Sequence, residues 1–295
     1  ERVTVALGGD GGDELFGGYP TFAVEALAGR WLDAAPARAL DLAGRSLAVA
    51  VRTTTALTGA GAGYFSFDFR LAQLARGLGE RGARRHQAWL AAFLPREVGA
   101  LLAPAIRAAA AADLYDHVGD RVARCRTRVP ADRLFCAYAL GYLADGVLQK
   151  VDRASMAVGL EVRSPLLDRA VIQLACGLPP ALRLGGTSGK PVLREAARGL
   201  VPESIRVRKK HGFAIPVAAW LRGPLVGWMR DLLSESTLRR QGLFDPRAVG
   251  RLVDAHLRGR ADHRKRLWTL LAFQAWALAP AYSGNTATRP APTAL

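Results

Sequence analysis

Val3-Thr-Val-Ala-Leu-Gly-Gly-Asp-Gly-Gly-Asp-Glu-Leu-Phe-Gly-Gly-Tyr19 is the stretch that decides the fold of this chain. Its apolar start predicts a short buried strand over residues 3–7, and the glycines that follow leave the backbone open to a ligand. Asp13 and Glu14 then open a predicted helix, where unpaired N–H groups and the helix dipole favour carboxylates. A glycine-rich turn between a strand and a helix is typical of a phosphate site.

The charges of this acidic turn (residues 8–14) favour a metal ion over a bare phosphate. Asp10, Asp13 and Glu14 would repel phosphate, whereas Mg²⁺ binds one or two carboxylates and completes its shell with water and phosphate oxygens. We therefore interpret the turn as half of a Mg²⁺–polyphosphate site, with a tight turn before a capped helix as the alternative. It is not a dinucleotide fingerprint, because Glu14 stands where a glycine is required, and no Lys-Ser/Thr follows as in a Walker A loop.

Two later stretches also suggest function. Glu161 and Arg163 flank Val162, so in an extended segment their side chains point the same way. A carboxylate held by a guanidinium near a second carboxylate suits an amine nucleophile, and a structural salt bridge is the alternative. The cationic stretch 206–210 is followed by Gly212 and Pro216, so it can lie over an anion, or it is a basic surface loop.

Three blocks in the same order resemble the C-terminal synthetase domain of the asparagine synthetase (glutamine-hydrolysing) family. The first runs from Gly9 to Tyr19, the second from Asp152 to Asp168, and the third, which carries the lysines, from residue 208 to residue 224. The match covers nearly the whole chain. It implies an α/β, mostly helical fold, the C-terminal part of a parallel-sheet ATP-pyrophosphatase (adenine nucleotide α-hydrolase-like) domain. We expect residues 1–282 to form this partial domain and residues 283–295 to be a disordered tail.

The resemblance also implies a carbon–nitrogen ligase that uses ATP and Mg²⁺. Aspartate or a related carboxylate would become an acyl-adenylate, which ammonia converts to asparagine, with AMP and pyrophosphate as the other products. The implied catalytic residues are Asp10, Glu161 and Lys210, with Glu161 near Asp10, and the implied Mg²⁺ ligand is Asp13. The residues expected to bind ATP and pyrophosphate are Gly8, Gly9, Gly11, Gly12, Asp152, Arg153 and Lys209, the last also being the reserve choice for Lys210.

Several features depart from the family pattern. No Ser-Gly-Gly-x-Asp-Ser pyrophosphate loop occurs, residue 1 is Glu1 and not the cysteine of a glutaminase domain, and Gly8 replaces a serine found in many relatives. We expect a piece of a longer protein, with a glutaminase domain upstream or in trans. These 295 residues alone should hydrolyse no glutamine and turn over little or no ATP.

One lysine-bearing loop is rejected as a nucleotide site. In residues 185–191 the first glycine falls one residue late for a phosphate loop, and Pro191 follows Lys190 where Ser or Thr is needed. We expect Pro191 to open a helix that runs through Leu200. Between residues 131 and 155, apolar residues at spacings of three and four, among them Leu140 and Leu143, predict a helix with one stripe against the core.

Composition argues against nucleic-acid-binding and membrane-spanning proteins. The net charge of +16 invites a nucleic-acid interpretation, but the arginines are spread over the whole length, so we consider nucleic-acid binding unlikely. No apolar run is long enough to cross a membrane. Three cysteines without metal-ligand spacing predict a reducing, cytoplasmic location: Cys125, Cys136 and Cys176.

Three alternatives stay open beside the asparagine-forming enzyme. The chain could be a non-catalytic remnant or subunit that docks on a partner supplying the pyrophosphate loop. It could be a basic nucleic-acid module, whose affinity would fall steeply with salt. Within the amide-forming family, its substrate could be a peptide or a specialised metabolite, as in β-lactam synthetase and lasso-peptide cyclases. If the chain forms an oligomer, we expect a homodimer.

Overall fold

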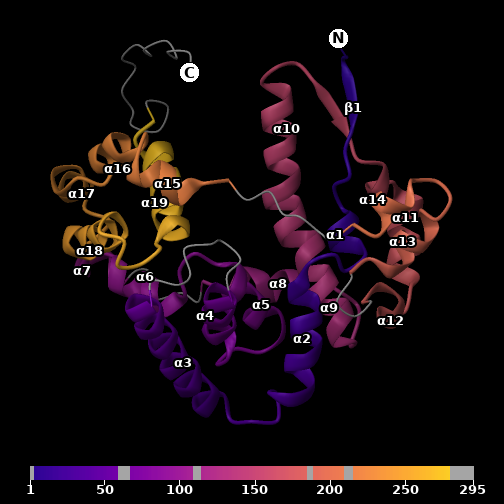
Figure 1. Ribbon diagram of the computed structural model, residues 1–295, viewed down its shortest axis with the longest axis horizontal. Helices are drawn as coiled ribbons and strands as arrows, with labels where there is room; N and C mark the ends of the chain where they lie inside the picture. The colour runs from indigo at the N-terminus through magenta and orange to yellow at the C-terminus, as the bar shows by residue number, and fades with distance from the viewer. Residues whose placement is uncertain (1–2, 59–66, 109–113, 185–188, 209–214, 280–295) are drawn as a thin grey trace. The chain divides into compact units, whose positions relative to one another are not determined.

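The computed structural model describes residues 3–58, 67–108, 114–184, 189–208 and 215–279. The chain divides into two compact units. Unit 1 comprises Glu1–Leu47, Gln73–Leu90 and Leu114–Gly212, and unit 2 comprises Ala48–Ala72, Ala91–Asp113 and Phe213–Leu295. Both units are mostly helical, and a small parallel sheet lies in unit 1 (Figure 1). The predicted mostly helical α/β fold is confirmed. The expected tail lies outside the described residues.

The sheet of unit 1 pairs two strands that are distant in sequence. Strand β1 (Val5–Leu7) runs parallel to β2 (Glu161–Arg163), with Val5 opposite Glu161 and Leu7 opposite Arg163. The amide N–H of Gly8 continues the ladder by donating to the Arg163 carbonyl at 2.7 Å. The predicted strand is therefore confirmed, and it positions the acidic turn beside the end of β2.

The prediction that this first strand is buried is wrong. Val3, Val5 and Leu7 are 68%, 41% and 74% exposed. Parallel sheets bury apolar strands by covering both faces and both edges. In the part of the chain that the structure describes, β2 is the strand that pairs with β1, so one edge of β1 has no neighbouring strand.

Four helices follow the acidic turn. Helix α1 (Gly12–Leu15) has Asp13 and Glu14 in its first turn, and α2 (Pro20–Trp31) and α3 (Ala37–Thr58) are separated near Pro36. Helix α4 covers Phe67–Gly77. Near the end of α3, the hydroxyls of Thr53 and Thr54 donate to carbonyls four residues back within the helix.

The remaining elements alternate short helices and turns. In unit 1 they are α5 (Gly82–Leu90), α8 (Asp116–Ala123), α9 (Pro130–Ala137), the π-helix η1 (Tyr138–Leu148), α10 (Gln149–Met156), the 3₁₀ turn η2 (Pro165–Leu167), α11 (Arg169–Gly177), α12 (Pro180–Arg183), α13 (Pro191–Ala196) and α14 (Glu203–Arg206). In unit 2 they are α6 (Pro95–Leu101), α7 (Pro104–Arg107), α15 (Val217–Arg222), α16 (Val226–Leu232), α17 (Glu235–Gln241), α18 (Pro246–Leu257) and α19 (Arg264–Ala277).

Elements α9, η1 and α10 run without a break from Pro130 to Met156, as the sequence predicts, but the middle is π-helical. A π-helix bonds each residue to the fifth one along, so spacings of three and four do not stay on one face. Leu143 of the predicted stripe is buried, whereas Leu140 is 42% exposed. The expected single apolar stripe is therefore wrong here.

Unit 2 has a core of its own, built by α15–α19 with α6. Leu221, Met229 and Leu267 are completely buried in it, whereas Trp268 and Trp276 of the same helical region are 39% and 52% exposed. His256 is also buried, and its Nδ1 accepts a hydrogen bond from the backbone N–H of His263 at 3.2 Å. Both histidines are thus engaged in local contacts.

Cys125 and Cys136 form a disulfide that links the end of α8 to α9, with their Cα atoms 6.5 Å apart, within the usual range. This pair was not predicted from the sequence. Because disulfides persist mainly in oxidising environments, the cysteines give no support to the predicted cytoplasmic location, which stays a prediction. Cys176 is exposed and unpaired. Among the described helices, none combines the length and apolar character needed to cross a bilayer.

Candidate nucleotide and metal site

The acidic turn is held against the second sequence block by its glycines. Gly11 has a φ of 87°, and a Cβ there would overlap the side chain of Leu167. A Cβ on Gly12 would lie 2.9 Å from Cδ1 of Leu166. Both glycines are buried. Packing against η2 therefore accounts for them, and two of the three blocks in the resemblance lie in direct contact.

Gly9 occupies the open part of the turn, and Gly8 is more closely packed. Among the described residues other than its chain neighbours, none has an atom within 4 Å of the place where a Cβ of Gly9 would be, and Gly9 is exposed. A Cβ on Gly8 would lie 2.9 Å from Oδ2 of Asp10 and 3.3 Å from Cγ1 of Val162. The carboxylate of Asp10 therefore lies beside the end of β2, with accessible backbone at Gly9.

Glu14 has a different environment from the two aspartates. It is only 2% exposed, and its Oε1 accepts a hydrogen bond from the hydroxyl of Tyr19 at 2.5 Å. Burial and the neighbouring Glu14 raise the pKa of Tyr19, so the hydroxyl stays a donor. Glu14 is committed to this internal bond, and the turn offers a ligand two carboxylates and not three.

Asp13 is paired with a lysine that the sequence analysis set aside. Nζ of Lys190 lies 2.8 Å from Oδ1 of Asp13, and the two side chains are 28% and 25% exposed. The loop before Pro191 was rejected as a phosphate loop on its spacing, yet its lysine reaches the acidic turn. A lysine that directly follows a glycine and precedes the first proline of a helix was the signal that could have identified it.

Glu161 and Arg163 form the expected pair on β2, with Nε donating to Oε1 at 2.7 Å. Both side chains are more than half exposed. The strand register places Glu161 opposite Val5, at the beginning of β2, whereas Asp10 follows Gly8, whose amide bonds to Arg163 at the other end of β2. Among the described residues, no hydrogen bond joins Asp10 to Glu161, so their joint action stays a prediction.

The other predicted binding residues lie apart from these contacts. Asp152 and Arg153 are exposed on α10, where Arg153 donates to Oε1 of Gln149 at 3.4 Å and the Asp152 carbonyl accepts from Ser155. Their hydrogen bonds stay within that helix. Lys209 and Lys210 lie outside the described residues.

The donor set of the acidic turn fits Mg²⁺ better than a metal that needs an all-protein cage. Within the described residues, no three Asp, Glu, His or Cys side chains gather as metal ligands. Mg²⁺ requires only one or two carboxylates, with water and phosphate oxygens completing its octahedron. Asp10 and Asp13 are the two carboxylates in place to supply them.

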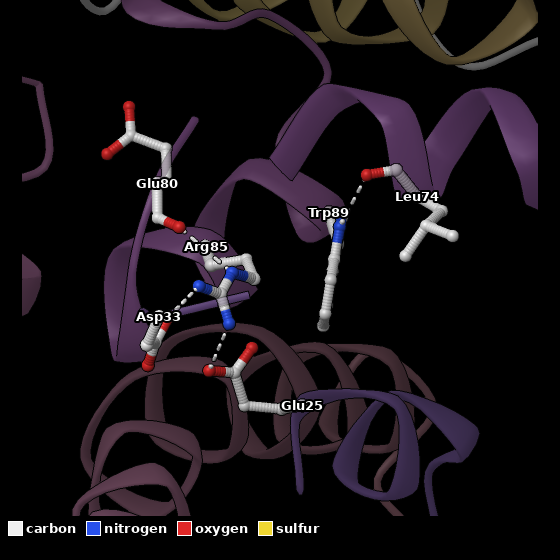
Figure 2. Close-up of polar contacts among 6 residues, drawn as sticks. All are labelled: Glu25, Asp33, Leu74, Glu80, Arg85 and Trp89. Carbon is white, nitrogen blue, oxygen red and sulfur yellow. Dashed lines mark hydrogen bonds and ion pairs between the residues drawn. The ribbon is translucent and has the colours of Figure 1, made fainter. Parts of the chain in front are cut away.

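The helix that follows the turn is anchored by a buried arginine (Figure 2). Arg85 of α5 is completely buried, and its guanidinium contacts Glu25 of α2 at 3.2 Å, Asp33, and the carbonyl of Glu80 at 2.9 Å. Burial raises the pKa of Glu25 to about 7, although Arg85 opposes the shift. These contacts fix α2 just after Tyr19.

Tyr19 also packs on aromatic residues that line a cavity. Its ring stacks on Tyr138 of η1 at 5.2 Å, and Tyr138 shares a hydrogen bond with Nε2 of His86 at 3.2 Å. Burial lowers the pKa of His86 to about 3, so this ring is neutral at physiological pH. Tyr138 and His86 line a cavity of about 290 Å³, whose described walls include none of the predicted site residues.

The fold is that of a mostly helical α/β domain with a small parallel sheet, and similarity to known proteins names the family. The family model described as asparagine synthase matches residues 1–278. The chain therefore belongs to the asparagine synthase family, which confirms the resemblance found in the sequence.

Individual relatives agree with this assignment. A Mycobacterium bovis protein named "Putative asparagine synthetase [glutamine-hydrolyzing]" is 31% identical over 281 residues, which is 94% of this chain and 39% of that protein. "Asparagine synthetase [glutamine-hydrolyzing] 1" of Bacillus subtilis is 34% identical over 135 residues, which is 46% of this chain and 21% of that protein. The chain thus spans well under half the length of these relatives. No solved structure matches it significantly.

Proposed function

We propose that this chain is the synthetase part of an ATP-dependent amide-forming enzyme. An oxygen of a carboxylate substrate, aspartate or a relative of it, attacks the α-phosphorus of ATP, and the bond to the β-phosphate oxygen breaks, releasing pyrophosphate. Ammonia then attacks the acyl carbon of the adenylate, and AMP leaves. The acidic turn, packed against the central block in a chain that matches the asparagine synthase family over residues 1–278, is the observation that carries this proposal.

The residues have the following proposed roles. Asp13, with Asp10 beside it, holds Mg²⁺, which supplies charge stabilisation for the departing pyrophosphate. Asp10 and Glu161 orient the amine and accept its proton, and Lys210 stabilises the negative charge that develops on pyrophosphate. The nucleotide is admitted at Gly9, where the backbone is accessible, and at the neighbouring Gly8. Nucleotide and pyrophosphate contacts are also assigned to Gly11, Gly12, Asp152, Arg153 and Lys209.

The test is exchange of labelled pyrophosphate into ATP, with aspartate and then a panel of other carboxylates as substrate, measured on the purified chain and on the chain fused to the portion of the mycobacterial relative that it does not match. Exchange that requires a carboxylate, and that falls at least a hundredfold in Asp13→Asn, supports the proposal. Arg198→Met, which removes a cation from an exposed pair with Glu195, is the matched control and should retain exchange. The carboxylate that supports exchange also separates an asparagine-forming enzyme from one that acts on a peptide or specialised metabolite. A longer form that exchanges normally with Asp13→Asn would contradict the role of Asp13.

A second candidate function is supported by the exposed strand β1. Val3, Val5 and Leu7 are exposed, as expected if a separate polypeptide supplies further strands together with the missing pyrophosphate loop. For this candidate, the chain alone catalyses no exchange. Activity should appear when the portion of the mycobacterial relative that this chain does not match is added as a separate polypeptide. Strong exchange by the chain alone would exclude it.

A further inference from the structure

Lys190 stands out by its backbone and by the place that its side chain reaches. Its φ is 53°, and it is the one non-glycine residue with a positive φ in the described part of the chain. Left-handed backbone is unfavourable for a residue with a side chain, and such conformations gather at functional sites when the surroundings hold them. Here the surroundings include Pro191, which follows directly, and the ion pair with Asp13.

Glycines enclose the ion pair of Lys190 and Asp13. A Cβ on Gly18 would overlap Oδ1 of Asp13 and crowd Cε of Lys190, and one on Gly12 would lie 3.7 Å from Nζ. A Cβ on Gly189 would lie 3.3 Å from the carbonyl oxygen of Gly17. The chain thus brings three glycines together to admit one lysine side chain to the acidic turn.

The ion pair of Lys190 and Asp13 is also partly exposed to solvent, whereas Arg85 is completely buried. About a quarter of each side chain is exposed, so water and small ions can reach part of the Asp13 side chain. A divalent cation that binds this carboxylate must share it with an ammonium already 2.8 Å away or displace it. Because like charges at that distance repel, bound Lys190 lowers the affinity of Asp13 for the metal.

We propose that Lys190 is the internal counter-ion of Asp13 and competes with the divalent cation for it. This inference rests on the proposed function, in which Asp13 is a Mg²⁺ ligand. Lys190 is a positioning residue. Before the metal binds, its ammonium holds the Asp13 carboxylate in place and balances its negative charge. The acidic turn then binds the metal poorly by itself and well only when phosphate oxygens complete the coordination shell.

The test measures Mn²⁺ binding to the chain without nucleotide, by the electron paramagnetic resonance signal of free Mn²⁺. Lys190→Met should tighten Mn²⁺ binding about tenfold, the effect that one neighbouring charge commonly has on proton binding at a carboxylate. Lys190→Arg keeps the charge and should bind like the wild type. Arg198→Met removes a cation that pairs with Glu195 and not with Asp13, and this variant should also bind Mn²⁺ like the wild type.

A double-mutant cycle identifies the site of competition. In an Asp13→Asn background, Lys190→Met should change Mn²⁺ affinity by less than twofold, because the carboxylate for which the two cations compete is gone. Equal or weaker Mn²⁺ binding by Lys190→Met, or tightening that persists without Asp13, overturns the proposal. If Lys190→Met does not fold by circular dichroism, Lys190→Gln, which keeps a hydrogen-bond donor for Asp13, takes its place with the same expected direction.

The outcome separates this inference from the proposed function. Competition seen with Mn²⁺ while no carboxylate supports pyrophosphate exchange leaves the counter-ion role standing and removes the synthetase role. If pyrophosphate exchange depends on Asp13 but Lys190→Met leaves the Mn²⁺ affinity unchanged, the synthetase role stands and the counter-ion role is removed.

Discussion

Two of the ion-pair sites of unit 1, that of Arg85 and that of Lys190, differ in almost every physical respect. Arg85 is completely buried, and three acceptors from residues 25, 33 and 80 surround its guanidinium (Figure 2). Lys190 is partly exposed and reaches one carboxylate, that of Asp13, from a left-handed backbone. The first pair holds helices together, and the second can be exchanged for a ligand.

The difference teaches how burial separates structural charge from functional charge. A sealed ion pair has already lost its hydration, so removing one partner leaves the other uncompensated. An accessible pair keeps part of its hydration and loses little when another ion replaces a partner. Four experiments, in decreasing order of expected effect, test this contrast.

Breaking the buried cluster should have the largest effect. Arg85→Met leaves Glu25 and Asp33 without their cation, and we expect it to lower the free energy of unfolding by about 3–5 kcal/mol. The measurement is the midpoint and slope of urea unfolding. A loss below about 1 kcal/mol would show that the cluster behaves like an exposed pair, and the contrast would fail.

The pH dependence of the same cluster should come next. Because the pKa of Glu25 is raised to about 7 in the folded chain from 4.5, the folded state binds more protons than the unfolded state between these values. The contribution of Glu25 to the free energy of unfolding should therefore be fully present below pH 4.5 and should be lost as the pH rises to 7. The slope contributed is at most about 1.4 kcal/mol per pH unit.

The control for this pH effect is Glu25→Gln, which cannot titrate. Urea unfolding followed at pH 5, 6 and 7 should show the Glu25 contribution in the wild type and lose it in the variant. An identical pH slope in both proteins would mean that Glu25 does not titrate in this window.

Removing the donor of Glu14 should have an intermediate effect. Tyr19→Phe keeps the ring stacked on Tyr138 but leaves the buried carboxylate of Glu14 without its hydroxyl partner. We expect a loss of about 1–3 kcal/mol in unfolding free energy, the cost of an unsatisfied buried group. Pairing it with Glu14→Gln in a double-mutant cycle should give a coupling above about 0.5 kcal/mol, and additive effects would refute the link.

The exposed pair should have the smallest effect. Arg198 and Glu195 meet at 2.8 Å, but their side chains are 65% and 61% exposed. Arg198→Met should change the unfolding free energy by less than about 1 kcal/mol, and 1 M salt should remove any difference. A cost similar to that of Arg85→Met would show that burial does not govern these ion pairs.

Local chemistry was readable from the sequence wherever neighbouring residues decide it. The strand before the acidic turn and the Glu161–Arg163 pair were predicted and are present. Both depend on contacts within a few residues, because glycines and an alternation of side chains act on their own segment.

Contacts between distant segments could not be read in the same way. The exposure of β1, the π-helical turn at Tyr138–Leu148, the disulfide of Cys125 and Cys136, and the isolation of Glu14 by Tyr19 were not predicted. Periodicity assumes one helical pitch, and spacing along the chain does not give distance in space. These features depend on which surfaces pack together, so they cannot be predicted from a local sequence pattern.

The sequence by itself determined the family of this protein, its mostly helical fold and the place of its acidic turn, because those follow from ordered motifs and local backbone preference. Only the tertiary structure decided which carboxylates of that turn are available. It buried Glu14 beneath Tyr19, and it brought Lys190 to Asp13 from a loop 177 positions further along the chain. Electrostatic pairing acts through distances in space, and these are fixed only when the glycines and helices have packed.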